Sequence, residues 1–336
     1  MTGRAPTVSV CIPTYNRAKL LQQSIESVLA QTFEDFELVI SDNASTDETE
    51  QVVKSYSDTR VVYSRNSRNI GWHGNMNQVL SLTRGEFLAI IPDDDLMMPE
   101  NLARKVAVLR QNPRVGLVHS KYHLINPEGR VVRSNTNWGH GPDRSSDAVE
   151  PGHEVLRALL LGFNSINLPT VLFRRACYER FGGFSDLLSH TDDYEYWMRI
   201  AAHDDVAFLA EPLVKWRIHS GTLTSQYILA EATGISNEGL QEQLLAKRMI
   251  LDQYGHRIPD SADLKEAVRR ETRDRVTLQA DLMLDAEGKQ GEARAFLFKM
   301  CRTFPELYLS SMTWKTVLKT FLSRRSVLLL KRISPL

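Results

Sequence analysis

The sequence predicts an α/β fold, in which helices cover both faces of a mainly parallel sheet and a helical region follows. Three observations support this prediction. Strand and helix patterns alternate over residues 1–125, which favours a parallel sheet. Several short apolar runs end at proline or another turn residue, as strands do. From residue 223 onward the apolar residues recur at helical spacing, and no strand pattern returns.

The elements of residues 1–125 follow in order. The first strand is expected at residues 8–12, a β-rich run that Pro13 stops. A helix follows over residues 20–29, where apolar residues recur at helical spacing. Ser45 and Glu48 form a capping box that opens a later helix, because each can satisfy a backbone N–H of the first turn. Further strands are expected at residues 36–40, 61–63, 86–91 and 115–118, and another helix at Pro99.

Residues 126–150 interrupt this alternation. They are rich in Asn, Gly, Ser and Asp, and we expect a long surface excursion that could act as a lid. The pattern then predicts a helix to about residue 161, and the mixed strand and helix pattern ends near residue 222. The expected organisation is an α/β domain over 1–222, with halves 1–125 and 126–222, and a helical region over 223–336. Within the second half we expect a strand near 170–173, a helix at 194–202, and β segments at 206–209 and 213–218.

Composition excludes several classes of protein. The 336 residues include 41 Lys+Arg and 41 Asp+Glu, and this balance argues against a nucleic-acid partner. A charged content of 24% together with an ordinary aromatic content of 8% excludes a mainly disordered chain. The three cysteines, Cys11, Cys177 and Cys301, lie far apart, which fits a reducing compartment better than a disulfide framework or a cysteine zinc site. Without a signal-type or membrane-spanning apolar run, we expect a cytoplasmic protein.

An acidic triplet, Asp93-Asp94-Asp95, follows the apolar run 88–91 and Pro92. Ligands of open α/β sheets bind at the carboxyl ends of the strands. Adjacent carboxylates repel one another unless a cation compensates, and Mg²⁺ or Mn²⁺ suits oxygen ligands shared with phosphates. We expect Asp93 and Asp95 to face the ion and Asp94 to point elsewhere. On these residues alone, a solvated acidic loop before the next helix explains the triplet equally well.

Several further segments stand out in their order along the chain. They are 10–17 (VCIPTYNR), 27–32 (SVLAQT), 36–47 (FELVISDNASTD), 68–71 (RNIG) with Asn75 and Asn77, the acidic triplet, 181–184 (FGGF), 191–195 (TDDYE) and 216–220 (WRIHS). This set resembles glycosyltransferase family 2 enzymes, with the triplet in the place of their DXD motif. No single segment is specific, but the ordered set is, and it covers roughly the first two-thirds of the chain. The resemblance implies the GT-A fold, the Rossmann-like fold of nucleotide-diphospho-sugar transferases.

The resemblance implies an inverting, metal-dependent transfer from a nucleotide diphosphate sugar to a saccharide, lipid-linked or other hydroxyl acceptor, in surface polysaccharide or glycoconjugate synthesis. Asp193 would be the base, and Asp192, where the family usually has glutamate, is the second candidate. Asp95 and His219 would ligate Mn²⁺ or Mg²⁺, and Asp93 would meet the ribose or the ion. The implied donor site has Pro13, Thr14 and Tyr15 against the nucleotide base, Asp42 hydrogen-bonded to that base, and Asn16, Arg17, Asn69, Asp93 and Asp94 beside them.

The same residues also have structural explanations. Asp192 and Asp193 precede an expected helix, whose dipole favours acids in the first turn. Asp42 fits a turn after a strand, and a lone His219 is more often a surface histidine than a ligand. The competing functions are a non-catalytic sugar-nucleotide-binding scaffold and a nucleotidyltransferase. A nucleotidyltransferase is less favoured, because no Gly-rich or strongly basic phosphate-binding signature follows the first strand.

The C-terminal residues 296–336 are basic, with eight Lys or Arg against one Glu, a balance of 8 − 1 = +7. Trp314, Val317, Leu318, Phe321 and Leu322 recur at helical spacing on one face. Such a helix can lie on the inner face of an anionic membrane. It can equally pack on its own domain or form a homodimer.

Overall fold

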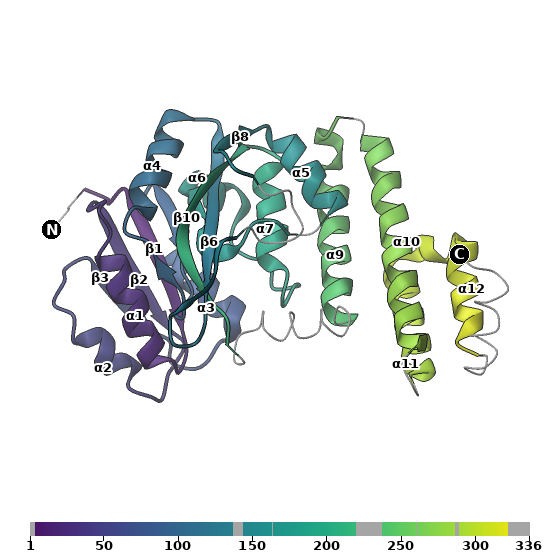
Figure 1. Cartoon of the computed structure of the whole chain (residues 1–336), viewed down its shortest axis with the longest axis horizontal. Coiled ribbons are helices and arrows are strands. Elements are labelled where there is room, and N and C mark those ends of the chain that lie inside the picture. Colours follow the sequence, from purple (N-terminus) through teal and green to yellow (C-terminus); the bar gives the residue numbers. More distant parts are fainter. Residues whose placement is uncertain are drawn as a thin grey trace. The chain divides into compact units, whose positions relative to one another are not determined.

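The computed structural model describes residues 4–136, 144–162, 164–219, 237–259, 261–285 and 289–321. The chain divides into two compact units, Met1–Thr222 and Leu223–Leu336. The first unit is built around a single sheet, and the described part of the second unit consists of helices (Figure 1). Each unit has its own buried apolar core.

The first half of the sheet follows the expected alternation. Strands β1 (Val8–Thr14), β2 (Phe36–Asp42), β3 (Val61–Arg65) and β4 (Phe87–Ile90) lie in the order β3-β2-β1-β4, and all three pairings are parallel. Every residue of β1, β2 and β4 is buried, because helices cover both faces of a parallel sheet. The chain order reverses beside β1, and ligands of such sheets bind at this point.

The second half of the sheet is mixed. The three-residue β9 (Leu172–Arg174) lies between β4 and β6 (Val115–Ile125) and is antiparallel to both. β10 (Asp205–Arg217) is parallel to β6, with register shifts between Leu209 and Val214. The two β segments expected at 206–209 and 213–218 are therefore one irregular strand. Antiparallel pairing adds β5 (Leu96–Met97) and β8 (Ala148–Glu150) to β10, and β7 (Val131–Thr136) to β6.

The excursion expected at residues 126–150 is more ordered than its composition indicates, because it contributes β7 and β8 to the sheet. Residues 137–143, where a lid was expected, lie outside the described residues. The sequence pattern also missed helix α3 (Gly71–Ser81) and helix α6 (Arg175–Phe181). The other helices of the first unit are α1 (Ala18–Leu29), α2 (Thr49–Lys54), α4 (Asn101–Gln111), α5 (Gly152–Leu161) and α7 (Asp192–Ala201).

The capping box expected at Ser45 and Glu48 is wrong. Helix α2 begins at Thr49, and Glu48 at its N-cap makes no side-chain capping bond. Asp47 Oδ1 instead accepts from the Thr49 backbone N–H at 3.1 Å. The Ser45 hydroxyl accepts from the Asn16 backbone N–H at 2.9 Å, so it joins two loops of the sheet and is not available to the helix.

The second unit confirms the expected helical region. Its helices are α9 (Asn237–Tyr254), α10 (Ser261–Asp285), α11 (Gln290–Thr303) and α12 (Ser311–Lys319). Their shared core includes Leu244, Val276, Leu297, Met300 and Val317. Among the described residues, none of the helices combines the length and apolar character needed to cross a membrane.

Candidate functional site

The loops that follow β1, β2 and β4 meet at the carboxyl edge of the sheet, beside the point where the strand order reverses. Asn16, in the loop after β1, has a positive φ of 53°, a conformation that asparagine tolerates better than most residues. Its side-chain Oδ1 accepts from the Thr46 backbone N–H of the loop after β2 at 2.7 Å. The loops are therefore held together before any ligand binds.

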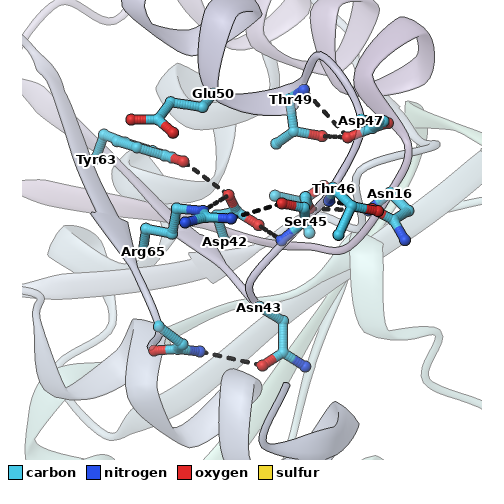
Figure 2. A network of polar contacts seen from close by, with 12 residues as sticks. Asn16, Asp42, Asn43, Ser45, Thr46, Asp47, Thr49, Glu50, Tyr63 and Arg65 are labelled. Carbon is cyan, nitrogen blue, oxygen red and sulfur yellow. Dashed lines mark hydrogen bonds and ion pairs between the residues drawn. The ribbon is translucent and has the colours of Figure 1, made fainter. Parts of the chain in front are cut away.

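Asp42 ends β2 and is fully buried. Its Oδ1 accepts from the Ser45 backbone N–H at 2.8 Å, and its Oδ2 accepts from the Tyr63 hydroxyl at 2.7 Å. The Arg65 guanidinium lies 3.3 Å from the same Oδ2 and donates to the Ser45 carbonyl (Figure 2). Burial and this carboxylate raise the pKa of Tyr63. Asp42 is thus a fixed acceptor with both oxygens engaged.

An asparagine cluster connects β2 with α3. Asn43 Nδ2 donates to Asn69 Oδ1 at 2.9 Å and to the Gly71 carbonyl at 3.1 Å. Asn43 Oδ1 accepts from the Ile70 backbone N–H at 2.9 Å. Asn75, one turn into α3, donates to the Ser41 carbonyl at 2.9 Å. The side chain of Asn69 therefore holds the start of α3 against the loop after β2.

Two acids of the triplet contact the loop after β1. The Thr14 hydroxyl donates to Asp93 Oδ2 at 2.7 Å. The Arg17 guanidinium reaches both Asp93 Oδ1, at 3.1 Å, and Asp94 Oδ2, at 2.8 Å. The structure thus brings four of the predicted donor-site residues into direct contact.

The end of β10 and the residues that follow it also contact the triplet. His219 Nε2 lies 3.0 Å from Asp94 Oδ2, whereas the Arg217 backbone N–H donates to Asp95 Oδ1 at 2.8 Å. The expected arrangement, with Asp93 and Asp95 facing one way and Asp94 another, is therefore not the one observed. The reason is a turn in which the Asp95 backbone N–H donates to the Pro92 carbonyl, because a turn does not alternate its side chains as a strand does.

The electrostatics of this acid cluster favour a cation. Burial, and then the charge of Asp94, raises the pKa of Asp93 to about 6 and raises the pKa of Asp95 well above its usual value. Asp95 Oδ2 is buried and has no hydrogen-bond partner. A buried carboxylate oxygen in this state is costly, and a hard divalent ion would satisfy it.

The three expected metal ligands, Asp93, Asp95 and His219, are not arranged around a common point. Within the described ranges, no group of three His, Cys, Asp or Glu side chains stands ready to hold an ion. His219 contacts Asp94 and not Asp93 or Asp95 in the contacts above, and Arg17 supplies the positive charge at Asp93. The cluster fits an ion by its chemistry, and the side chains would have to rotate to bind it.

The second acidic pair opens helix α7. Asp192 Oδ2 lies 3.3 Å from His73 Nε2, and His73 stands in the first turn of α3. The Asn164 amide lies 3.3 Å from Asp193 Oδ2. Burial, and then the charge of Asp192, raises the pKa of Asp193 to about 8. The helix dipole does favour acids here, but it does not explain a carboxyl that holds its proton near neutral pH.

Tyr15 differs from its neighbours in the donor-site set because its side chain is 44% exposed, whereas Pro13 is buried in β1. An exposed ring beside the carboxyl edge can stack on a flat ligand. The sequence did not single out His73, Asn164 or Arg217 as site residues. Arg217 lay within a quoted segment, but no local pattern indicates that His73 and Asn164 lie beside acids more than 25 residues away.

A mixed α/β sheet with loops, acids and an exposed aromatic residue at its carboxyl edge is the arrangement expected of the GT-A fold. Residues 9–155 match the family model described as Glycosyl transferase family 2. The matched residues lie within the first unit, and together with the named relatives they identify the chain as a glycosyltransferase that is similar to family 2. The predicted GT-A fold with a helical extension is thereby confirmed.

Named relatives and solved structures agree with this assignment. An uncharacterized glycosyltransferase, MJ1057 of Methanocaldococcus jannaschii, is 26% identical over 63% of this chain and 71% of its own length. The Escherichia coli UDP-Glc:alpha-D-GlcNAc-diphosphoundecaprenol beta-1,3-glucosyltransferase WfgD is 26% identical over 69% of this chain and 80% of its own.

Two solved structures share the fold. The mannosyltransferase PcManGT from Pyrobaculum calidifontis, in complex with GDP-Man and Mn²⁺, superposes with a TM-score of 0.55 and 19% identity, covering 98% of this chain and 88% of its own. S. aureus TarS 1–349, in complex with UDP-GlcNAc, superposes with a TM-score of 0.52 and 18% identity, covering 94% and 79%. At these identities the likeness shows the fold alone.

Proposed function

We propose that this glycosyltransferase moves a sugar from a nucleotide diphosphate sugar to an acceptor hydroxyl, with inversion and with the help of Mn²⁺ or Mg²⁺. The acceptor is a saccharide or a lipid-linked saccharide of surface polysaccharide or glycoconjugate synthesis. The observation that carries the proposal is the acid cluster of Asp93, Asp94 and Asp95, which contacts Arg17 and His219 at the carboxyl edge of the sheet.

The donor's nucleotide would lie against the loops after β1 and β2. Asp42 and Asn16 are held by hydrogen bonds that do not depend on a ligand, so the loops are pre-organised and lose little entropy on binding. The exposed ring of Tyr15 offers a stacking surface for the nucleotide base. Donor selectivity then depends on which groups of the base reach these loops.

The donor's pyrophosphate would lie at the acid cluster. Asp93, Asp95 and His219 would hold the ion, and Asp95 contributes a buried oxygen that lacks a hydrogen-bond partner. The bound ion supplies Lewis-acid stabilisation of the diphosphate leaving group. Arg17 balances the acids in the structure, and its guanidinium is close enough to turn to a phosphate oxygen when the ion takes over that role.

Asp193 is the proposed base. It lies at the start of α7 with its pKa raised to about 8. Near neutral pH only a fraction of Asp193 is therefore ionised, but that carboxylate takes a proton more readily than an ordinary aspartate does. Asn164 lies against Asp193 and His73 against Asp192, which gives the two carboxylates different surroundings. A positioned base of this kind contributes roughly 10²–10⁴-fold to the rate.

The comparisons support the substrate classes without fixing them. WfgD is named for a UDP-sugar donor and a diphosphoundecaprenol-linked acceptor. PcManGT binds GDP-Man with Mn²⁺, and TarS binds UDP-GlcNAc. We therefore propose a nucleotide sugar as the donor, with a lipid-linked acceptor as the first to test.

The first experiment identifies the donor. Thermal unfolding of the full chain is measured with a panel of UDP-, GDP- and dTDP-sugars, with Mn²⁺ or with a chelator. A donor that binds only the folded state raises Tm by mass action, and we expect this rise to depend on the ion. No rise with any sugar nucleotide would refute the proposed donor class.

The second experiment separates a transferase from a binding scaffold. Asp193→Asn should bind the donor that the panel identifies and transfer its sugar at least a hundredfold more slowly than the parent. Asp186→Asn, at an exposed acid six residues before α7, is the matched control and should keep the parental rate. If both variants transfer equally well, Asp193 is not the base. If the parent binds the donor but neither transfers nor hydrolyses it, the scaffold function is correct.

A further inference from the structure

Helix α12 (Ser311–Lys319, yellow in Figure 1) buries mainly threonines and exposes large apolar side chains. Its buried side consists of Thr313, Thr316 and Val317, and Thr320 continues it. The exposed side carries large apolar residues: Met312 is 42% exposed, Trp314 43%, Leu318 63% and Phe321 59%. The sequence pattern placed Val317 on the same face as Trp314, Leu318 and Phe321, but the structure turns Val317 inward and these three outward.

This arrangement inverts ordinary amphipathicity. A surface helix normally turns its apolar stripe to the core and its polar residues to solvent. Here hydroxyl-bearing threonines pack inward, and an aromatic and aliphatic stripe at positions 314, 318 and 321 faces out. Single exposed apolar residues are common, but a grouped set marks an interaction surface.

The exposed side chains are held in place. Trp314 Nε1 donates to the Tyr308 carbonyl at 2.8 Å, and the Tyr308 ring lies 6.1 Å from the Trp314 ring. The Arg294 guanidinium stacks 3.9 Å from the Phe321 ring centre and donates to the Thr320 carbonyl at 2.8 Å. The outward orientation is therefore supported by specific contacts to neighbouring elements.

Charge identifies the partner. Residues 296–336 carry eight basic residues and one acid, a balance of 8 − 1 = +7. Helix α12 contains no acid; its Lys315 is exposed, and its Lys319 lies 3.2 Å from Asp281 of α10. Tryptophan and tyrosine favour the boundary between lipid headgroups and acyl chains, and an exposed lysine beside them is attracted to anionic headgroups. Self-association through this face would bring the basic residues of two copies together, which is unfavourable.

We propose that the α12 face, formed by Trp314, Leu318 and Phe321, docks this enzyme on an anionic lipid surface. The apolar side chains enter the headgroup boundary, and Lys315 remains at headgroup level through its long aliphatic stem. Helix α10, which packs beside α12, also carries two exposed leucines, Leu278 and Leu282, one turn apart. This inference does not depend on which sugar nucleotide or acceptor the enzyme uses.

The test is sedimentation of the full chain with vesicles. The chain is mixed with vesicles of phosphatidylcholine alone or of phosphatidylcholine with 40% phosphatidylglycerol, and the bound fraction is measured at low and high salt. We expect binding to the anionic vesicles, weakened by salt. The double variant Trp314→Ser/Leu318→Ser should lower the partition coefficient about tenfold or more.

The matched control removes two exposed apolar side chains elsewhere. Val132 is 59% exposed and Val149 is 50% exposed, both on edge strands of the first unit, and Val132→Ser/Val149→Ser should pellet as the parent does. Circular dichroism and Tm establish that both double variants are folded.

Three results would overturn the proposal. The first is no pelleting of the parent with anionic vesicles. The second is equal pelleting of the parent and the α12 variant. The third is a parental dimer in light scattering that the α12 variant converts to a monomer while vesicle binding is unchanged, because the face would then serve self-association. In the expected case, brominated lipids also quench the parent's tryptophan fluorescence more than that of the α12 variant.

Discussion

Replacing Asp193 by asparagine should stabilise the protein while abolishing transfer. The Asp193 pKa of about 8 in the folded chain exceeds the ordinary value of 3.8. Below pH 3.8 the carboxyl is protonated whether the chain is folded or unfolded, so it has no effect on stability. Between pH 3.8 and 8 the unfolded chain ionises more readily, and stability is lost as the pH rises.

The size of this loss follows from the shift. Each unit of pKa difference corresponds to about 1.4 kcal/mol, so a difference of roughly three units between pH 3.8 and 7 gives an upper limit of about 4 kcal/mol. The Asp193 side chain is partly exposed and coupled to Asp192. We therefore expect Asp193→Asn to raise the free energy of unfolding by about 1–3 kcal/mol at pH 7.

The assay is urea unfolding of the parent and Asp193→Asn at pH 4.5, 6, 7 and 8.5, without donor or ion. The gain of the variant over the parent should grow with pH and level off above pH 8. Asp186→Asn controls for a general effect of removing a negative charge and should show a small gain that does not change with pH. A gain for Asp193→Asn that is the same at every pH, or a loss of stability, would refute the reasoning.

Three further predictions concern packing and charge. His73→Ala removes the ring 3.3 Å from Asp192 and should lower kcat about tenfold with little change in the donor KM, and His73→Gln should restore most of it in steady-state kinetics. Gly183→Ala would place a Cβ 2.1 Å from Asn77 Oδ1, so we expect a loss of about 1–3 kcal/mol in urea unfolding; parental stability would show that this loop can shift. Burial lowers the pKa of Lys105 to about 7 in the folded chain. Between pH 7 and 10.5 only the unfolded chain keeps this lysine protonated, which favours unfolding. The free energy of unfolding should therefore rise over this range, as the lysine of the unfolded chain loses its proton. Lys105→Met should therefore raise Tm at pH 7 and have little effect at pH 10, and an equal gain at both would contradict the charge argument.

Strands β1 to β4 could be predicted from the sequence because local patterns determine them. Strands β1, β2 and β4 are fully buried and appear as continuous apolar runs, and Pro92 marks the end of one of them. Strand β9 was placed only approximately, because three residues carry too little pattern to show that they insert antiparallel between β4 and β6. Its position depends on contacts distant in sequence, which no local window contains.

The second acidic pair shows the same limit at the site. Asp192 and Asp193 were singled out by resemblance, but their different surroundings come from His73 and Asn164. Asn77 in α3 helps to fix this region by accepting from the Phe184 backbone N–H at 2.8 Å. Helix α3 therefore contacts both the loop after β2 and the acids of α7, although the sequence pattern did not predict a helix there.

The acid triplet follows β4, but its side chains do not alternate as we expect from the sequence, and its long-range contacts explain why. Asp94 meets His219 and Asp95 meets the backbone of Arg217 across 125 and 122 residues of sequence. Arg217 is itself buried, and its guanidinium donates to the Asp94 carbonyl at 2.7 Å. The end of β10 therefore fixes the backbone of the triplet, while Arg17 pairs with the carboxylates of Asp93 and Asp94 and His219 lies beside Asp94. A divalent ion that takes the place of the Arg17 guanidinium at these carboxylates would not need to move the strands that carry the triplet.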